Sequence, residues 1–419
     1  MRAAQGAREP RRAVQRLVDR GRGRARTPGG AAPVTAVLAG PDGAWRRVPE
    51  AAARDALPSV APGGSAVLCP TFVARCGEEG HRAVVGHLLS QLAELHEARP
   101  ALPVTLWIGM QWFPGRDGEE EEAARRLTEL GRVVAREAPW LPFAGLCLPG
   151  PGKVRTTNAA IRLGAAHAPA GWLWLDDDVV AEPRCATLLV ERFLAGSRRG
   201  AVGAVKVPLA TAHRTSRLLR ALGGATAPRR AHPHACCMLV ADGVVRGGIP
   251  AELDMDDAFV LFELLDPRAD EPFHDLELVE GARCRFYQGA GFGETVRRLR
   301  ISLLYHLTFM ARYSWPTARV YFQQSLFYGL WPLAPWDGSR GVRTGLLRWL
   351  VKAVHFGWFA GYAGVLAFRG ATGLRPAPEG GLYSAGFQSP LNAEGTAEGT
   401  ADTGADSRAS DRRAPKDAG

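Results

Sequence analysis

The 419-residue sequence lacks any cysteine pattern that would bind zinc or build a disulfide framework. Its seven cysteines lie singly, apart from the adjacent pair Cys236 and Cys237, and no CxxC pair occurs. Zinc knuckles and disulfide scaffolds need cysteines at short, repeated spacings, so neither class is supported. The simple interpretation is a set of reduced, mostly buried thiols in a cytosolic compartment.

Long hydrophobic runs are also lacking. The N-terminus has no apolar segment of the kind that a secretory signal carries, so no such signal is expected. Residues 353–368 form a stretch of sixteen residues without formal charge, whereas a membrane span needs about 20 apolar residues. Arg348, Lys352 and Arg369 flank this stretch like anchors at a membrane interface. Two interpretations stay open, a membrane-embedded or interfacial helix and a buried core helix.

Acidic residues are the minority charge, with 42 Asp and Glu against 52 Lys and Arg, which leaves a net charge of +10. The first thirty residues hold nine Arg and two acids. We expect residues 1–33 to be a disordered basic arm, with attraction to an anionic membrane surface as the alternative. No nucleic-acid-binding motif is present, so nucleic acid is not an expected partner. Residues 376–419, poor in large apolar groups, are predicted to be a disordered tail.

Between these ends, apolar runs alternate with helical patterns, which indicates an α/β layer with a mostly parallel sheet. Strands are predicted at 65–72, 103–110, 143–148, 171–175, 201–207, 236–241 and 276–289, and helices at 81–96, 119–137, 156–166 and 184–194. Residues 34–300 are therefore expected to form one catalytic domain. Residues 301–375 are expected to form apolar C-terminal helices.

The most informative stretch is WLWLDDDVV, in which an apolar strand ends in Asp176, Asp177 and Asp178. Charges are costly inside a protein, so a strand that stops in three carboxylates delivers them to its carboxyl end. Ligands bind at that end in open α/β sheets. Paired carboxylate oxygens suit a hard divalent cation that shares its shell with phosphates.

Several blocks, in order, resemble family 2 glycosyltransferases with the GT-A fold. They are Cys69 to Phe72, GKVRTTNAAIRLG (152–164), WLWLDDDVV, GGIPAELDMDDAF (247–259) and RRLRI (297–301). The resemblance covers roughly residues 60–305. It implies a GT-A nucleotide-diphospho-sugar transferase fold, with a Rossmann-like, mostly parallel mixed sheet flanked by helices. The C-terminal helices are expected to be apolar and possibly membrane-associated.

The resemblance also implies roles for the donor side of the site. Asp176 and Asp178 occupy the two named places of the DxD motif and are the predicted metal ligands, for Mn²⁺ or Mg²⁺. The other predicted donor-binding residues are Pro70, Thr71, Lys153, Arg155, Asn158, Asp177, Arg298 and Arg300. Asp177 has a turn residue as its alternative role, and Asn158 a loop brace. For Arg298 and Arg300 the alternative role is a basic collar at a membrane surface.

On the acceptor side, the resemblance assigns the general base to the acidic pair after the Gly247-Gly248 turn. Asp257 is the predicted catalytic base, with Asp256 as the fallback. Acids in the first turn of a helix also serve as N-terminal caps, and that alternative stays open. The histidines of the HPH segment, His232 and His234, are candidates for the acceptor side or simple loop residues.

The sequence departs from the family in two places. No acid ends the strand at Trp107–Gln111, where family members read the base, so Gln111 is the candidate for a different base contact. Ile301 replaces the tryptophan that lies beside the acceptor chain in polymerising members. We therefore expect transfer of a single sugar rather than processive synthesis.

The predicted activity is that of an inverting, metal-dependent glycosyltransferase of the hexosyltransferase type at the cytoplasmic face of a membrane. Its expected partners are a nucleotide-sugar donor and an acceptor that is a lipid, a polyprenyl-linked glycan or a small natural product. The alternatives are a sugar-phosphate nucleotidyltransferase and a catalytically inactive, GT-A-like membrane scaffold.

Overall fold

The computed structural model describes residues 35–39, 44–49, 52–53, 66–68, 71–73, 78–113, 117–150, 153–164, 169–177, 179–196, 200–208, 233, 236–250, 255–286, 305–307, 309–310, 312–336 and 341–372. The predicted basic arm (1–33), the predicted tail (376–419) and both histidines of the HPH segment lie outside these ranges.

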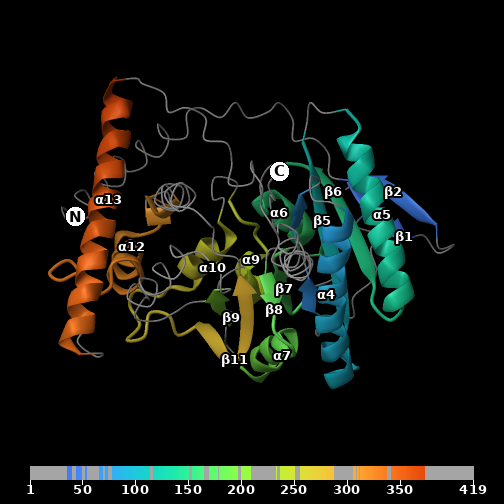
Figure 1. The fold of residues 1–419 in the computed structure, drawn as a ribbon, viewed down its shortest axis with the longest axis horizontal. Helices are drawn as coiled ribbons and strands as arrows, with labels where there is room; N and C mark the ends of the chain where they lie inside the picture. The colour runs from blue at the N-terminus through green and yellow to red at the C-terminus, as the bar shows by residue number, and fades with distance from the viewer. Residues whose placement is uncertain are drawn as a thin grey trace, which may run out of the picture.

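A mixed eleven-stranded sheet forms the centre of the described chain (Figure 1). Its strands are β1 (Thr35–Ala39), β2 (Trp45–Pro49), β3 (Ala66–Leu68), β4 (Thr71–Val73), β5 (Val104–Trp112), β6 (Phe143–Pro149), β7 (Gly171–Leu175), β8 (Val179–Ala181), β9 (Ala201–Pro208), β10 (Cys237–Ala241) and β11 (Leu276–Phe286). The order is β2-β1-β6-β5-β3-β7-β10-β9-β11-β8, and β4 pairs with β5 outside this path.

The centre of the sheet is parallel, as predicted for an α/β layer. Strand β3 pairs parallel with β5 and β7, and β5 pairs parallel with β6. Antiparallel pairing begins on both sides of this centre, where β1 pairs with β6 and β10 pairs with β7. Beyond the antiparallel β10, strand β9 pairs parallel with β11, so the sheet is mixed.

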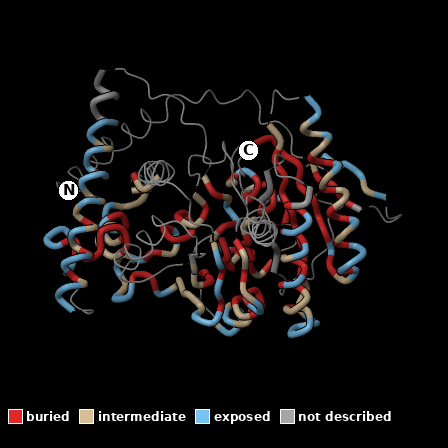
Figure 2. The backbone as a smooth tube through the Cα atoms, in the orientation of Figure 1, coloured by how far each residue is buried: buried red, intermediate tan, exposed pale blue. Residues whose placement is uncertain are grey.

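The helices are α4 (Glu78–Ala98), α5 (Glu119–Glu137), α6 (Lys153–Gly164), α7 (Cys185–Ala195), α9 (Asp242–Val245), α10 (Asp256–Leu264), α12 (Trp315–Tyr321) and α13 (Val342–Thr372), with a π-helix η2 (Phe322–Leu326) after α12. Helices α4, α5 and α7 cover one face of the sheet, and α6 and α10 contribute to the core on the other, which extends to α12 and α13. Each face of the sheet has its own hydrophobic core, the first core under α4, α5 and α7 and the second core on the opposite face. The side chains of β7 alternate between them: Leu173 and Leu175 belong to the first core, and Trp172 and Trp174 belong to the second. Figure 2 shows this buried interior in red.

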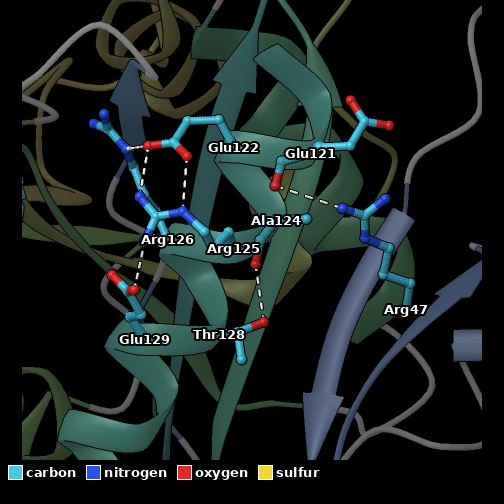
Figure 3. Close-up of polar contacts among 8 residues, drawn as sticks. All are labelled: Arg47, Glu121, Glu122, Ala124, Arg125, Arg126, Thr128 and Glu129. Atoms are coloured by element: carbon cyan, nitrogen blue, oxygen red, sulfur yellow. Dashed lines mark hydrogen bonds and ion pairs between the residues drawn. The ribbon is translucent and has the colours of Figure 1, made fainter. Parts of the chain in front are cut away.

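Helix α5 illustrates how local charge sets an element's bounds. Four glutamates, Glu119 to Glu122, occupy its first turn, where the helix dipole favours negative charge. Glu122 pairs with Arg125 at 2.8 Å and with Arg126 at 2.6 Å (Figure 3). These two arginines lower the pKa of Glu122 to about 2. The predicted range, 119–137, is confirmed residue for residue.

Helix α4 positions the segment that follows the triple acid. The side-chain amide of Gln91 donates to the carbonyl of Glu182 at 3.2 Å and accepts from the N–H of Ala186 at 3.1 Å. One turn earlier, Nε2 of His87 accepts from the N–H of Ala181 at 3.0 Å. A polar stripe on α4 therefore fixes β8 and the start of α7.

Helix α13 lies at the far end of the molecule from β1 and β2 (Figure 1). It has 31 residues and packs Phe359 and Phe356 against the second core. In the described part of the chain, no helix combines the length and apolarity that crossing a membrane requires. The structure thus gives no support to the membrane-spanning interpretation of the C-terminal region.

Five cysteines are described, and all five are buried thiols that form no disulfide: Cys147, Cys185, Cys236, Cys237 and Cys284. Four of them gather around β10, where Sγ of Cys185 lies 3.5 Å from Sγ of Cys237, and Sγ of Cys236 lies 3.9 Å from Sγ of Cys284. Burial raises the pKa of Cys147 to about 12, so its thiol is inert near neutral pH.

Candidate active site

The carboxyl ends of the parallel strands β6, β5, β3 and β7 meet at one edge of the sheet. Asp176 follows β7 directly, and its N–H donates to the carbonyl of Cys236 at 3.0 Å, which extends the β7–β10 ladder. Its side chain is 22% exposed. The first acid of the triple therefore lies where open α/β sheets bind their ligands.

Lys153 joins two of the predicted site acids. Its Nζ atom lies 2.5 Å from Oδ1 of Asp176 and 3.1 Å from Oδ2 of Asp256. The three residues come from the end of β7, the start of α6 and the start of α10. The structure thus brings a predicted metal ligand, a predicted donor-binding lysine and a predicted catalytic acid into one ion-paired cluster.

The carboxyl group of Asp256 is held in a low-dielectric environment. The residue is 5% exposed, and burial raises its pKa. The ammonium of Lys153 opposes this shift, and the neighbouring carboxylate of Asp257 adds to it. In this conformation Asp256 holds Lys153, and its fallback role as the base stays a prediction.

Asp257, the predicted base, is half-buried at the start of α10. Its Oδ1 accepts from the N–H of Ala258 at 2.8 Å, and Oδ1 of Asp256 accepts from the N–H of Asp257 at 3.1 Å. Each acid therefore bonds to the amide of the residue that follows it in the first turn of α10, where the helix dipole favours negative charge. The N-cap residue, Met255, makes no side-chain cap hydrogen bond. These bonds occupy one oxygen of each carboxylate, and the catalytic role of Asp257 stays a prediction.

Asn158 braces the turn that precedes α10. Its Nδ2 donates to the carbonyl of Ile249 at 2.7 Å, and its Oδ1 accepts from the N–H of Ile249 at 2.7 Å. Gly248, next in the turn, has a φ of 80°, and a Cβ added there would lie 3.4 Å from Oδ1 of Asn158. The bracing role is the one that this geometry shows, while contact with the donor stays a prediction.

The end of β5 is packed tightly against α6. A Cβ on Gly109 would lie 1.9 Å from Cγ2 of Thr156, so only glycine fits. Two residues on, Nε2 of Gln111 donates to Oγ1 of Thr156 at 2.8 Å. Gln111 is 2% exposed, so the hypothesis that it contacts a base finds no support in this conformation.

The remaining predicted donor residues are only partly described. Arg155 is exposed on α6, with Nη1 donating to the carbonyl of Pro149 at 3.4 Å. Thr71 opens β4, and its backbone pairs with Gly109 at the end of β5. Asp177 follows Asp176 in a turn. Pro70, Asp178, Arg298 and Arg300 lie outside the described residues, and their predicted roles stay predictions.

Two further residues approach the acidic pair, and sequence reasoning missed both. The hydroxyl of Tyr321 lies 2.9 Å from Nδ1 of His306. Burial, with smaller effects of His355 and Lys352, lowers the pKa of His306 to about 4, and the carboxylate of Asp257 opposes that shift. Burial and Asp257 also raise the pKa of Tyr321 well above its usual value. Near neutral pH a neutral tyrosine and a neutral imidazole therefore share this hydrogen bond. No motif marks either residue, since both stand in apolar helical segments.

The carboxylate oxygens of the site suit a hard divalent cation, although the described residues do not form a complete set of metal ligands. In the described part of the chain, no group of three or more His, Cys, Asp or Glu side chains is placed to hold a metal ion. The geometry instead shows an ammonium group held between the carboxylates of Asp176 and Asp256. Oxygen ligands of this kind are those that Mg²⁺ and Mn²⁺ prefer, so Asp176 fits the predicted ligand role.

The sequence matches no family model and no curated protein. Among solved structures, a mannosyltransferase from Pyrobaculum calidifontis in complex with GDP-Man and Mn²⁺ is 16% identical, with a TM-score of 0.41 over 95% of this chain and 88% of that chain. Glucosyl-3-phosphoglycerate synthase from Mycobacterium tuberculosis, in complex with Mn²⁺ and UDP-glucose, is 15% identical, with a TM-score of 0.34 over 59% of this chain and 78% of that chain. Similarity at these scores is too weak to assign an activity.

Proposed function

We propose that this chain is an inverting, metal-dependent glycosyltransferase of the GT-A type, which moves a single sugar from a nucleotide-diphosphate sugar to an acceptor hydroxyl. The observation that carries the proposal is the ion-paired cluster of Asp176, Lys153 and Asp256 at the carboxyl edge of the parallel strands. Three of the sequence blocks that resemble family 2 glycosyltransferases supply these residues. They meet although up to about a hundred residues separate them in the chain.

On the donor side, Asp176 and Asp178 are the proposed ligands of Mn²⁺ or Mg²⁺. When bound, such a cation neutralises the negative charge that develops on the departing diphosphate. Lys153 orients the carboxylate of Asp176 through the 2.5 Å ion pair and adds a second positive charge at the same edge. Thr71, whose backbone pairs with β5 at Gly109, and Pro70 are proposed to contact the donor.

On the acceptor side, Asp257 takes the proton of the acceptor hydroxyl on a carboxylate oxygen. The hydroxyl oxygen forms its bond to the anomeric carbon while the bond from that carbon to the diphosphate breaks. One base and one displacement invert the anomeric configuration. Asp256, buried against Lys153, acts as a positioning residue that links the base to the donor side.

The acceptor class is proposed more broadly. A lipid, a polyprenyl-linked glycan and a small natural product all offer a hydroxyl, and the described site does not select among them. We place the enzyme at the cytoplasmic face of a membrane. A sugar-phosphate nucleotidyltransferase, the alternative, needs a glycine-rich basic loop directly after the first strand. Residues 69–80 follow that strand and contain a single arginine, which counts against this alternative.

Donor binding is the first test. Purified full-length protein is incubated with UDP-, GDP-, TDP- and CMP-sugars, with and without Mn²⁺, and its thermal midpoint is measured. The proposal expects a metal-dependent rise with the sugars of one nucleotide. No rise with any donor would overturn it, and a rise with sugar phosphates and nucleoside triphosphates instead would favour the nucleotidyltransferase.

Site variants are the second test. With the donor identified, Asp257→Asn and Asp176→Ala should each lower turnover by about 100-fold or more, because one removes the base and the other a metal ligand. Asp270→Asn, which changes an exposed acid between α10 and β11, is the matched control and should keep full activity. Full turnover in both site variants would exclude this mechanism, and absent turnover in every sample would favour the inactive scaffold.

A further inference from the structure

Exposed apolar side chains are concentrated in the C-terminal part of the structure. Among the described residues, twelve large hydrophobic side chains are exposed, and eleven of them lie between Trp315 and Val365. Six of the eleven follow one face of α13 after its first turn: Leu346, Leu347, Leu350, Val354, Trp358 and Val365. Figure 2 shows the exposed stripe along this helix. Clusters of this size on a protein surface mark an interaction site rather than chance exposure.

The polarity of α13 is the reverse of that of a surface helix in water. Leu346 is 59% exposed and Leu350 is 54% exposed, whereas Arg348 and Lys352 on the same helix are 3% and 4% exposed. Nζ of Lys352 donates to the carbonyl of Leu326, at the end of η2, at 2.7 Å. The guanidinium of Arg348 lies 5.6 Å from the ring centre of Tyr328. The helix thus buries Arg348 and Lys352 against η2 and the residues after it, and presents its leucines outward, an arrangement that is favourable when the outer medium is apolar.

The surroundings of this face carry the two signatures of a lipid interface. Trp331 and Trp336 are exposed in the loop that leads to α13, and Trp349 ties that loop to the helix by donating to the carbonyl of Trp331 at 2.7 Å. Indole rings concentrate at the headgroup level of membranes. Residues 301–378 also contain eight Lys and Arg against a single acid, Asp337. Arg348 and Lys352 are buried, but Arg312, Arg319 and Arg343 are exposed and complement an anionic lipid surface.

We propose that the outer face of α13 and the neighbouring exposed tryptophans lie in the plane of a bilayer that contains anionic lipids. The helix is parallel to the membrane, since it is not apolar enough to cross one. A second copy of the chain is a poorer occupant, because a self-complementary interface would bring two strongly basic segments together. The tail is poorer too, because residues 376–419 hold only four large apolar side chains, Leu382, Tyr383, Phe387 and Leu391.

The inference does not rest on the proposed function, because membrane binding is measured without donor or acceptor. Full-length protein is mixed with vesicles of phosphatidylcholine alone or with added phosphatidylglycerol, and the bound fraction is measured by flotation. Quenching of tryptophan fluorescence by brominated lipids reports insertion. We expect binding to the anionic vesicles, weaker binding to the neutral ones, and quenching that reports a shallow position.

The double variant Leu350→Glu/Val354→Glu places two charges on the outer face, where both side chains are already exposed. It should weaken vesicle binding about tenfold or more while the circular dichroism spectrum is unchanged. Leu194→Glu is the matched control, since Leu194 is 46% exposed on α7, away from this face. Unchanged binding of the double variant, or no binding of the unmodified protein, would overturn the inference. So would a dimer in solution that the double variant dissociates, because the face would then be an interface between two copies.

Discussion

The side chain of Asn158 and the backbone of Ile249 form a closed pair of hydrogen bonds, each 2.7 Å long, across 91 positions of the sequence. One partner belongs to α6, whose first residue is Lys153, and the other to the turn that leads to α10 with Asp256 and Asp257. The pair therefore ties α6 to the segment that follows α9.

Asn158→Ala should lower the free energy of unfolding by about 1 to 3 kcal/mol, because it leaves the N–H and carbonyl of Ile249 without their partners. Denaturant unfolding measures this loss. Asn158→Asp is the graded comparison, since it keeps an acceptor for the N–H but sets a carboxylate oxygen against the carbonyl. An alanine variant as stable as the unmodified protein would show that water replaces the brace.

The two glycines of the turn before α10 should differ in their tolerance of a side chain. Gly248 has a φ of 80° and lies against Asn158, whereas a Cβ on Gly247 would meet nothing within 4 Å. Gly248→Ala should cost about 1 to 2 kcal/mol because an L-residue is strained in this region. Gly247→Ala, the control, should cost less. Equal losses in denaturant unfolding would contradict this assignment of strain.

The contact of Gly109 with Thr156 predicts a suppressor pair. Gly109→Ala should destabilise the fold by about 1 to 3 kcal/mol, because the new methyl group would overlap Cγ2 of the threonine. Thr156→Ser removes that carbon and keeps the oxygen that accepts from Gln111. The double variant should recover most of the loss in thermal or denaturant unfolding. Absence of recovery would mean that the new methyl group displaces the backbone of β5 rather than the side chain of Thr156.

Lys153 separates two carboxylates, and replacing it tests whether a divalent cation takes the same place. Lys153→Met should lower the thermal midpoint, because Asp176 and Asp256 then lose the ammonium between them. Added Mn²⁺ should raise the midpoint of this variant more than that of Asp176→Asn, in which one oxygen ligand is lost. An equal response of the two variants to Mn²⁺ would place the metal elsewhere.

The buried Lys352 predicts a dependence of stability on pH. Burial, with a smaller effect of Arg348, lowers the pKa of Lys352 from 10.5 to about 8. Below about pH 8 both folded and unfolded states carry the charge, so its burial cost is fully present. Between about pH 8 and 10.5 the unfolded state binds more protons, so this residue's contribution to stability rises with pH, by about 3 kcal/mol at most.

The stability difference between Lys352→Met and the unmodified protein should therefore shrink from about pH 7 to about pH 10. Denaturant unfolding at the two pH values measures it. Lys352→Arg is the control, because a guanidinium stays charged throughout this window. A methionine variant whose advantage does not change with pH would mean that the ammonium is solvated in the folded state.

Much of the element order follows from local pattern. The ranges of α5 and β7 agree with the prediction, and the predicted strands and helices between 65 and 289 all correspond to observed elements with shifted ends. The elements that were missed are short or lie at an edge. Strand β2, WRRVP, shows little alternation of apolar and polar residues. Its Trp45 packs against Gly131 of α5, a contact between residues far apart in the sequence. Strand β8 has only three residues.

By itself the sequence determined that an apolar strand ends in Asp176, that an acidic pair opens a later helix, and that the C-terminal region is apolar and basic. These are properties of neighbouring residues, and hydrophobic periodicity and charge report them directly. Only the tertiary structure decided that Lys153 joins Asp176 to Asp256, that Asn158 braces Ile249, and that α13 turns its leucines outward and Arg348 and Lys352 inward. Those facts depend on which surfaces the folded chain brings together, and sequence spacing carries no record of that choice.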